Sequence, residues 1–128
     1  LFQRVPGLIG IGKYTGNGNA NGPYIVIDDG AQGFRPAWIM EKRTDAAGAW
    51  YITDVARNAY NPINFSFLAE GNNADVTGTA SSGAFLDATA NGYKIRGTST
   101  GQEYNINNGK YIYVAFADQP FQLQGRAR

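Results

Sequence analysis

The amino-acid sequence predicts an all-β fold, an antiparallel β-sandwich or jelly roll of about seven to nine short strands. The first reason is composition. The 128 residues include 17 Gly, 8 Tyr, 7 Phe and 2 Trp, and only 16% are charged, where about 25% is usual. The second reason is that turn signals recur about every 8–12 residues. The third is that helix-favouring Glu and Lys are scarce, which excludes a helical bundle.

Strands in the first half of the chain are predicted at residues 8–15, 24–28, 37–44 and 50–55. The first two are separated by Gly and Asn residues at 16–22, which tolerate the backbone angles of a loop. The last two form a hairpin, because the connection at 45–48 has a length that hairpins use. Trp38 and Trp50 lie on its two arms, and we expect their rings to pair on one face if the register permits.

Strands in the second half are predicted at residues 65–70, 84–87, 93–96 and 111–117, with a weak one near Val76. Asn91-Gly92 is the strongest hairpin signal in the sequence. The last strand is apolar on both faces, so we expect it in the middle of a sheet. We predict a single domain over residues 1–121, because this length suits one core, and a tail or linker at 122–128.

Two absences limit the chemistry of the chain, which contains neither Cys nor His. It therefore has no Ser-His-Asp or Cys-His catalytic system and no His- or Cys-ligated zinc. Some pair of its ten acidic residues always fits the spacing of a glycosidase, so that signal has little specificity. Asp28 and Asp29 are interpreted as a turn before Gly30 in preference to a calcium site. We expect no enzymatic activity, no metal and no cofactor.

The charge pattern argues against two classes of partner. The formal net charge is +1, and the scattered Lys and Arg do not form the basic stripe of a nucleic-acid-binding protein. No apolar run approaches the roughly 20 residues that a membrane-spanning helix needs. We therefore expect neither nucleic acid binding nor membrane insertion.

The aromatic side chains suit either a stacking platform for a glycan or the filling of a core with few Leu. Tyr60 and Tyr104 lie on predicted loops beside Asn61 and Gln102, a mixture typical of recognition surfaces, so these four are the candidate ligand contacts. Residues on predicted strands are assigned to the structural core. They are Trp38, Ile39, Trp50, Tyr113, Val114 and Phe116.

Three segments of the sequence have a pattern known from another group of proteins. They read GFRPAWIMEKRTD at 33–45, GYKIRG at 92–97 and GKYIYVAFADQPF at 109–121, and the first is followed by WYI at 50–52, Arg57 and YNP at 60–62. Together they resemble a domain family of tailed-bacteriophage virion proteins of the marine phage type, often found beside laminin-G-like or concanavalin-like domains. The resemblance covers roughly residues 8–121 and brings no catalytic residues with it.

The resemblance implies a viral structural protein located in the virion, usually as one module of a longer chain. We expect a tail-fibre or appendage module that presents loops for attachment to host-surface glycans. The alternative is a capsid decoration or head-fibre protein that makes subunit contacts without a receptor of its own, and a polysaccharide depolymerase is a third reading. The expected partners are other virion proteins and further copies of the chain, with a trimer favoured.

Overall fold

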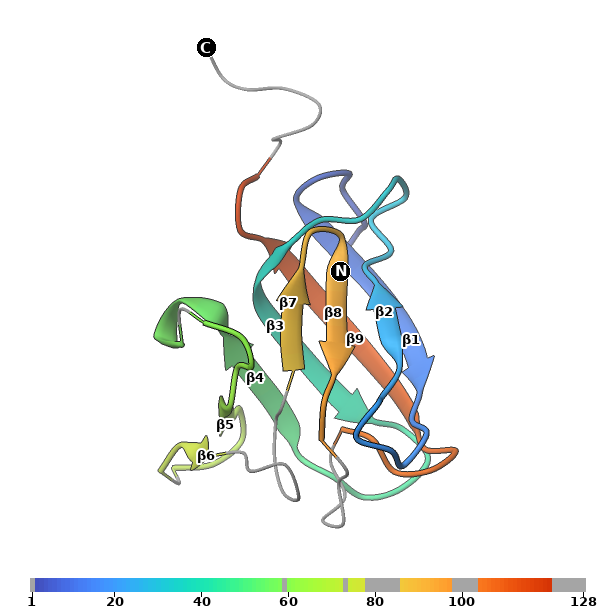
Figure 1. Cartoon of the computed structure of the whole chain (residues 1–128), viewed down its shortest axis with the longest axis vertical. Helices are drawn as coiled ribbons and strands as arrows, with labels where there is room; N and C mark the ends of the chain where they lie inside the picture. Colours follow the sequence, from blue (N-terminus) through green and yellow to red (C-terminus); the bar gives the residue numbers. More distant parts are fainter. Residues whose placement is uncertain (1, 59, 73, 78–85, 98–103, 121–128) are drawn as a thin grey trace.

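The computed structural model describes residues 2–58, 60–72, 74–77, 86–97 and 104–120. Within these residues the chain forms nine strands in two antiparallel sheets packed face to face, so the predicted β-sandwich is confirmed (Figure 1). One sheet has the order β1-β9-β3-β4-β5-β6 and the other the order β2-β8-β7. The strands are β1 (Ile9–Thr15), β2 (Tyr24–Val26), β3 (Pro36–Arg43), β4 (Trp50–Asp54), β5 (Phe65–Leu68), β6 (Val76–Thr77), β7 (Leu86–Thr89), β8 (Gly92–Ile95) and β9 (Lys110–Ala117).

A single 3-10 turn, η1 (Val55–Arg57), follows β4 in the described part of the chain, and the Asp54 side chain caps it by accepting the Ala56 N–H at 3.0 Å. No helix within the described ranges has the length and apolar character needed to cross a membrane.

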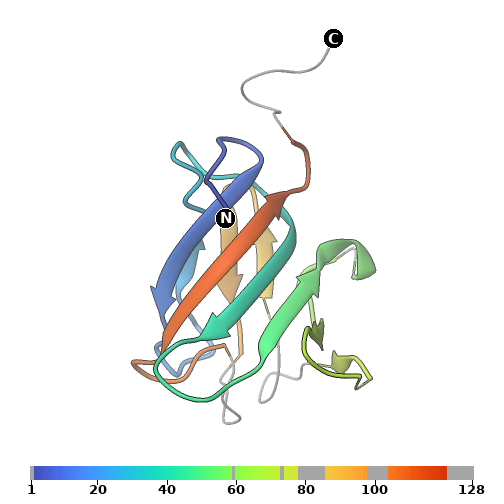
Figure 2. The same ribbon diagram turned by 180° about the vertical axis from the view of Figure 1, so that it is seen from behind.

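The last strand, β9, lies between β1 and β3, which confirms the prediction that it is central (Figure 2). Val114 pairs with Ile11 on one side and with Met40 on the other. Such a strand is hydrogen-bonded to a neighbouring strand along each edge, and its apolar side chains pack on both faces of the sheet. The first and last strands of the fold are therefore hydrogen-bonded to each other.

The predicted hairpin of β3 and β4 is present, but its two tryptophans do not pair. The register places Met40 opposite Ile52, and so sets Trp38 opposite Asp54 and Trp50 opposite Lys42. The two rings thus lie at opposite ends of the hairpin. The expectation of a Trp–Trp contact is wrong, because a strand pattern does not by itself determine register.

The second predicted hairpin, around Asn91-Gly92, is confirmed by the pairing of β7 with β8. On its other edge β8 pairs with β2, where Gly92 is opposite Val26. A Cβ at Gly92 would lie 1.9 Å from the carbonyl oxygen of Ile25. Glycine at this position therefore allows β2 to approach β8.

The core lies between the two sheets and is filled largely by tyrosine and isoleucine. The fully buried members include Ile39, Leu86, Tyr93, Ile95 and Tyr111 of the two sheets, and Ile27 directly after β2. Ring contacts connect the sheets, because Tyr93 of β8 packs edge-to-face against Tyr14 of β1 at 6.4 Å and Tyr113 of β9 at 5.8 Å between centroids. Large aromatic side chains supply the apolar area that the scarce Leu residues do not.

Of the six residues assigned to the core, Ile39 and Tyr113 lie between the sheets. The other four have side chains on the opposite side of the six-stranded sheet, namely Trp38, Trp50, Val114 and Phe116. Val114 is nevertheless buried, at 7% exposed, so its assignment to the structural core is confirmed. Trp38, Trp50 and Phe116 are only partly buried, so their assignment to the core is wrong. Strand β3 is apolar at both odd and even positions, so its sequence does not say which set faces the second sheet.

Candidate interaction face

The side of the six-stranded sheet that faces away from β2, β8 and β7 is the candidate site, and we call it the outer face. Successive side chains of a strand point to opposite sides, and paired residues point to the same side. The register therefore assigns each outward residue to one of three rows that run across the strands. Figure 2 looks onto this side of the sheet, and no described element lies over it.

The middle row is entirely apolar across five strands. It consists of Ile11, Val114, Met40, Ile52 and Phe67, each paired with the next. Val114 is only 7% exposed although it lies outside the inter-sheet core. Paired Cβ atoms in antiparallel strands are about 4.5–5.5 Å apart, so these side chains form a continuous apolar strip.

A second row lies toward the start of β3 and ends in a carboxylate. It contains Ile9, Phe116, Trp38 and Asp54. The Trp38 and Phe116 rings meet edge-to-face, with centroids 5.4 Å apart. Asp118 follows β9 directly and is exposed, and its carboxylate is 3.8 Å from the Arg35 guanidinium. We call this side of the outer face the acidic end.

The third row lies toward the end of β3 and contains two lysines, Lys13 and Lys42, with Ile112 between them and Trp50 beyond. The Lys42 ammonium lies 5.7 Å from the Trp50 ring centroid, a cation–π contact, and donates a hydrogen bond to the Gly48 carbonyl. Lys110 begins β9 at the same side. We call this side the basic end.

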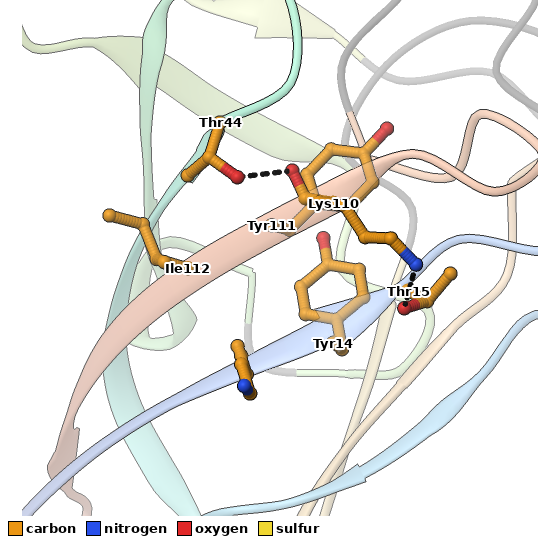
Figure 3. Close-up of a pocket in the computed structure, with 7 residues that line it drawn as sticks. Tyr14, Thr15, Thr44, Lys110, Tyr111 and Ile112 are labelled. Carbon is orange, nitrogen blue, oxygen red and sulfur yellow. Dashed lines mark hydrogen bonds between the residues drawn. The ribbon is translucent and has the colours of Figure 1, made fainter.

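A shallow groove of about 460 Å³ opens at the basic end (Figure 3). Lys110 donates to the Thr15 hydroxyl at 3.2 Å and accepts through its carbonyl from the Thr44 hydroxyl at 3.2 Å, so the groove has fixed walls (Figure 3). Its lining is Lys13, Tyr14, Thr15, Thr44, Lys110, Tyr111 and Ile112. Two lysines and two hydroxyls make this end suited to anionic or hydrogen-bonding groups of a partner.

The candidate ligand contacts lie in different environments. Tyr60 is 83% exposed, and the adjacent Asn61 is fixed because its amide donates to the Ala88 carbonyl at 2.9 Å and accepts from the Ala88 N–H at 3.0 Å. Tyr60 therefore projects from an anchored loop and stays a candidate contact. Asn61 uses its side-chain amide to hold that loop. Gln102 lies outside the described residues.

Tyr104 is 1% exposed, and its ring packs 4.8 Å from that of Tyr51. Its assignment to a binding surface is therefore wrong. The next residue explains why this segment lies inside: the buried Asn105 amide donates to the carbonyls of Asn19 and Gly97 at 2.7 and 3.0 Å. These bonds replace strand pairing and hold a non-strand segment against the core.

A buried carboxylate lies directly beneath the outer face. Glu41 of β3 is 1% exposed, and the hydroxyls of Tyr93 and Tyr14 donate to its Oε2 at 3.1 and 3.2 Å. Its Oε1 has no hydrogen-bond partner among the described residues. Burial raises the pKa of Glu41 from 4.5 to about 7, although the two tyrosine hydroxyls act in the opposite direction.

Sequence reasoning missed Glu41, although a signal was present. Ile39 and Glu41 are two positions apart on one strand and so must face the same side. Once Ile39 is placed in the core, Glu41 follows it there.

The Asp28-Asp29-Gly30 segment is a turn, with the buried Asp29 carboxylate at its centre. Asp29 accepts backbone N–H groups of Ala31, Gly7 and Gly33 at 2.8, 2.9 and 3.1 Å. Its oxygens are thus used to hold the loop. Within the described ranges, no three His, Cys, Asp or Glu side chains are grouped as a metal site would require.

Comparison with known proteins gives one match, to a protein family. No curated protein matches the chain, and no solved structure does. A family model described as "Domain of unknown function (DUF7483)" matches residues 1–120, nearly the whole sequence. The chain therefore belongs to the DUF7483 family.

Proposed function

We propose that this chain is a structural module of a bacteriophage virion, part of a fibre or other appendage, and that it works through surface contact. The observation that carries the proposal is the middle row of the outer face. Antiparallel sheets with one solvated face normally alternate apolar and polar residues, whereas this row is apolar across five strands. A continuous apolar surface of this kind marks a site of protein contact.

The segments that resemble phage virion proteins support the same reading. The segment at 33–45 covers β3, and the segment at 109–121 covers β9. These two central strands supply six of the thirteen residues in the three rows of the outer face. The resemblance therefore includes the centre of the proposed contact surface.

Host attachment is proposed for the loop that carries Tyr60. An exposed tyrosine on an anchored loop loses little conformational entropy on binding and can stack on a sugar ring. In a test with host cells, Tyr60→Ala is expected to weaken binding of the chain about tenfold. Tyr24→Ala is the matched control, because Tyr24 is also exposed but lies on β2. Equal binding by all three proteins would contradict the attachment role.

The alternative is a capsid decoration or head-fibre protein whose outer face packs against neighbouring virion subunits. The outer face favours this reading as strongly as it favours an appendage, whereas the Tyr60 loop favours attachment. Antibodies against the domain, applied to purified intact and disrupted particles, locate it. Labelling of fibres supports the first proposal and labelling of the capsid surface the second, and particles that carry no label would overturn both.

A further inference from the structure

We infer that the outer face binds the outer face of a second copy of this chain, as a two-fold pair whose basic and acidic ends are opposed. The inference rests on the contact role proposed above for that face. It adds the identity of the partner and its orientation.

The size of the outer face suits a weak, reversible pair. Strands lie about 4.8 Å apart, and outward side chains recur about every 6.6 Å along a strand, so the residues of the three rows cover roughly 400 Å². Two copies would bury roughly 800 Å² together, which is in the range of weak, transient protein contacts. Two sheet faces also fit each other, since twisted sheets pack at about −30°.

The distribution of charge selects a second copy and fixes its direction. Lys13, Lys42 and Lys110 lie at the basic end, whereas Asp54 and Asp118 lie at the acidic end. A two-fold axis in the plane of the sheet and perpendicular to the strands brings the basic end of one copy over the acidic end of its partner. An axis parallel to the strands would oppose lysines to lysines, which is unfavourable.

Part of the charge near the acidic end is paired within the chain. Arg57 binds Asp75 through two guanidinium nitrogens, and Arg35 lies 3.8 Å from Asp118, so the net negative charge of this end is that of Asp54. At the basic end Arg43 pairs with Asp45 at 2.7 Å, and the Glu70 carboxylate lies beside Trp50, whose N–H it accepts at 2.9 Å. The three lysines exceed this one carboxylate, so the basic end keeps a net positive charge. The outer face therefore carries opposite net charge at its two ends.

A face that meets a copy of itself makes an isologous contact, which closes with two subunits. A trimer requires two different surfaces that meet head to tail. The geometry of the outer face thus points to a pair in place of the trimer that the resemblance favours.

Sedimentation equilibrium of the 128-residue chain tests the inference. The wild-type chain is expected to form dimers, and Met40→Glu, which places a charge at the centre of the middle row, to raise the dissociation constant about 30-fold. Val26→Glu is the matched control, because Val26 is apolar and 48% exposed but lies on β2 in the other sheet. Near-UV circular dichroism verifies that each variant keeps its fold.

A charge exchange separates a contact effect from a folding effect. A chain with Lys13→Asp and Lys42→Asp, and a chain with Asp54→Lys and Asp118→Lys, are each expected to dimerise weakly. Mixed together they should form a heterodimer, because both contact regions then join lysines to aspartates. Weaker dimerisation of each exchanged chain than of wild type supports the orientation, because an axis parallel to the strands would oppose like charges in the wild type and the variants alike. Equal dimerisation of wild type and both exchanged chains overturns the orientation, and no recovery on mixing overturns the charge contact.

Other outcomes would overturn the pair itself. The inferred pair is wrong if the chain stays monomeric at several hundred micromolar or sediments as a trimer. It is also wrong if Met40→Glu leaves the dimer unaffected. The proposed virion role is tested separately, by antibody labelling of particles. A dimer found together with unlabelled particles would retain the pair and remove the virion role.

Discussion

Glu41 is expected to make the chain more stable in mild acid than at neutral pH. The carboxyl is protonated below a pKa of about 7 in the folded protein but ionises near its ordinary value of 4.5 when unfolded. Between these values the folded state holds one more proton, so the free energy of unfolding falls as pH rises. The contribution is complete below pH 4.5 and lost by about pH 7, a decline of about 3 kcal/mol.

The groups that face Glu41 do not titrate in this window. Tyr93 of β8 and Tyr14 of β1 contact it directly, and burial first, then the Glu41 charge, raises the pKa of both hydroxyls well above the usual value. Burial also raises the pKa values of Tyr111 and Tyr113 on the adjacent β9. The pH dependence is therefore attributed to Glu41.

Urea unfolding at pH 4.5, 6 and 8 measures this effect, with Glu41→Gln as the variant. Glutamine retains an acceptor for the tyrosine hydroxyls but does not ionise, so its stability is expected to change by less than about 1 kcal/mol over this range. Glu70→Gln is the control, because Glu70 is exposed, and it should decline as the wild type does. A decline that persists in Glu41→Gln would contradict the assignment.

Asp29 is expected to act with the opposite sign. Burial alone would raise its pKa, but hydrogen bonds from the Gly7, Ala31 and Gly33 amides lower it below 3.8. Its contribution is present above pH 3.8 and is lost as the pH falls further. Asp29→Asn turns one acceptor into a donor facing a backbone N–H, at a cost of about 1–3 kcal/mol at pH 7.

Denaturant unfolding at pH 7 and pH 3 verifies the sign. The stability difference between Asp29→Asn and wild type should shrink at pH 3, because this pH lies below 3.8 and the unfolded wild-type chain then takes up a proton at Asp29. Asp28→Asn serves as the control, because Asp28 is the exposed neighbour. A difference of the same size at both pH values would exclude the ionised carboxylate as its source.

At the scale of the element, the three-stranded sheet depends on Gly92 in β8. An added Cβ would lie 1.9 Å from the Ile25 carbonyl oxygen and 3.0 Å from the Val26 Cα, both of which are backbone atoms of β2. Gly92→Ala must therefore separate β2 from β8, and we expect a loss of about 3 kcal/mol. Gly48→Ala is the control, because its Cβ would meet only the Arg43 Cβ at 3.6 Å.

Chemical denaturation of both alanine variants decides this prediction. Gly48→Ala is expected to stay within about 0.5 kcal/mol of wild type. If Gly92→Ala were equally mild, the tight pairing of β2 with β8 would not be the feature that requires glycine there.

The sequence predicts the positions of the strands better than it predicts which side chains of each strand face the core. The hairpins at β3–β4 and β7–β8 follow from local turn residues, and the central place of β9 follows from its apolar character on both sides. The side on which Trp38 lies does not follow, because it depends on pairing with β9, more than 70 residues away. Tyr104 was misassigned because its polar neighbours suggested a surface loop, whereas Asn105 satisfies its amide internally.

At the scale of the whole molecule, the order of strands is the part that sequence reasoning leaves open. Strand β1 pairs with β9 across almost the full length of the chain, and any two apolar strands are compatible with such a pairing. The outer face exists only because of this order, since β1 and β9 contribute Ile11 and Val114 to the middle row. The candidate site was therefore not predictable as a surface, although each of its strands was.

The tryptophans and the core tyrosines, whose spectra can be followed separately, lie on different sides of the six-stranded sheet. Both tryptophans lie on the outer face, whereas Tyr14, Tyr93 and Tyr111 lie in the inter-sheet core. Tryptophan fluorescence therefore follows the outer face, and tyrosine near-UV absorbance follows the core. Because β3 and β9 carry residues of both groups, the two sides are expected to unfold together as one domain.

Thermal or urea unfolding followed by both signals tests this cooperativity, with the variant Met40→Glu used to keep self-association out of the measurement. The two curves should share one midpoint and one slope, because separating the outer face from the core would require breaking the pairing of β9 with β1 and β3. Tyr51→Phe is a control that alters a core signal and leaves both tryptophans in place. A fluorescence transition that precedes the tyrosine transition would mean that the outer face unfolds separately, and the chain would then not be a single cooperative domain.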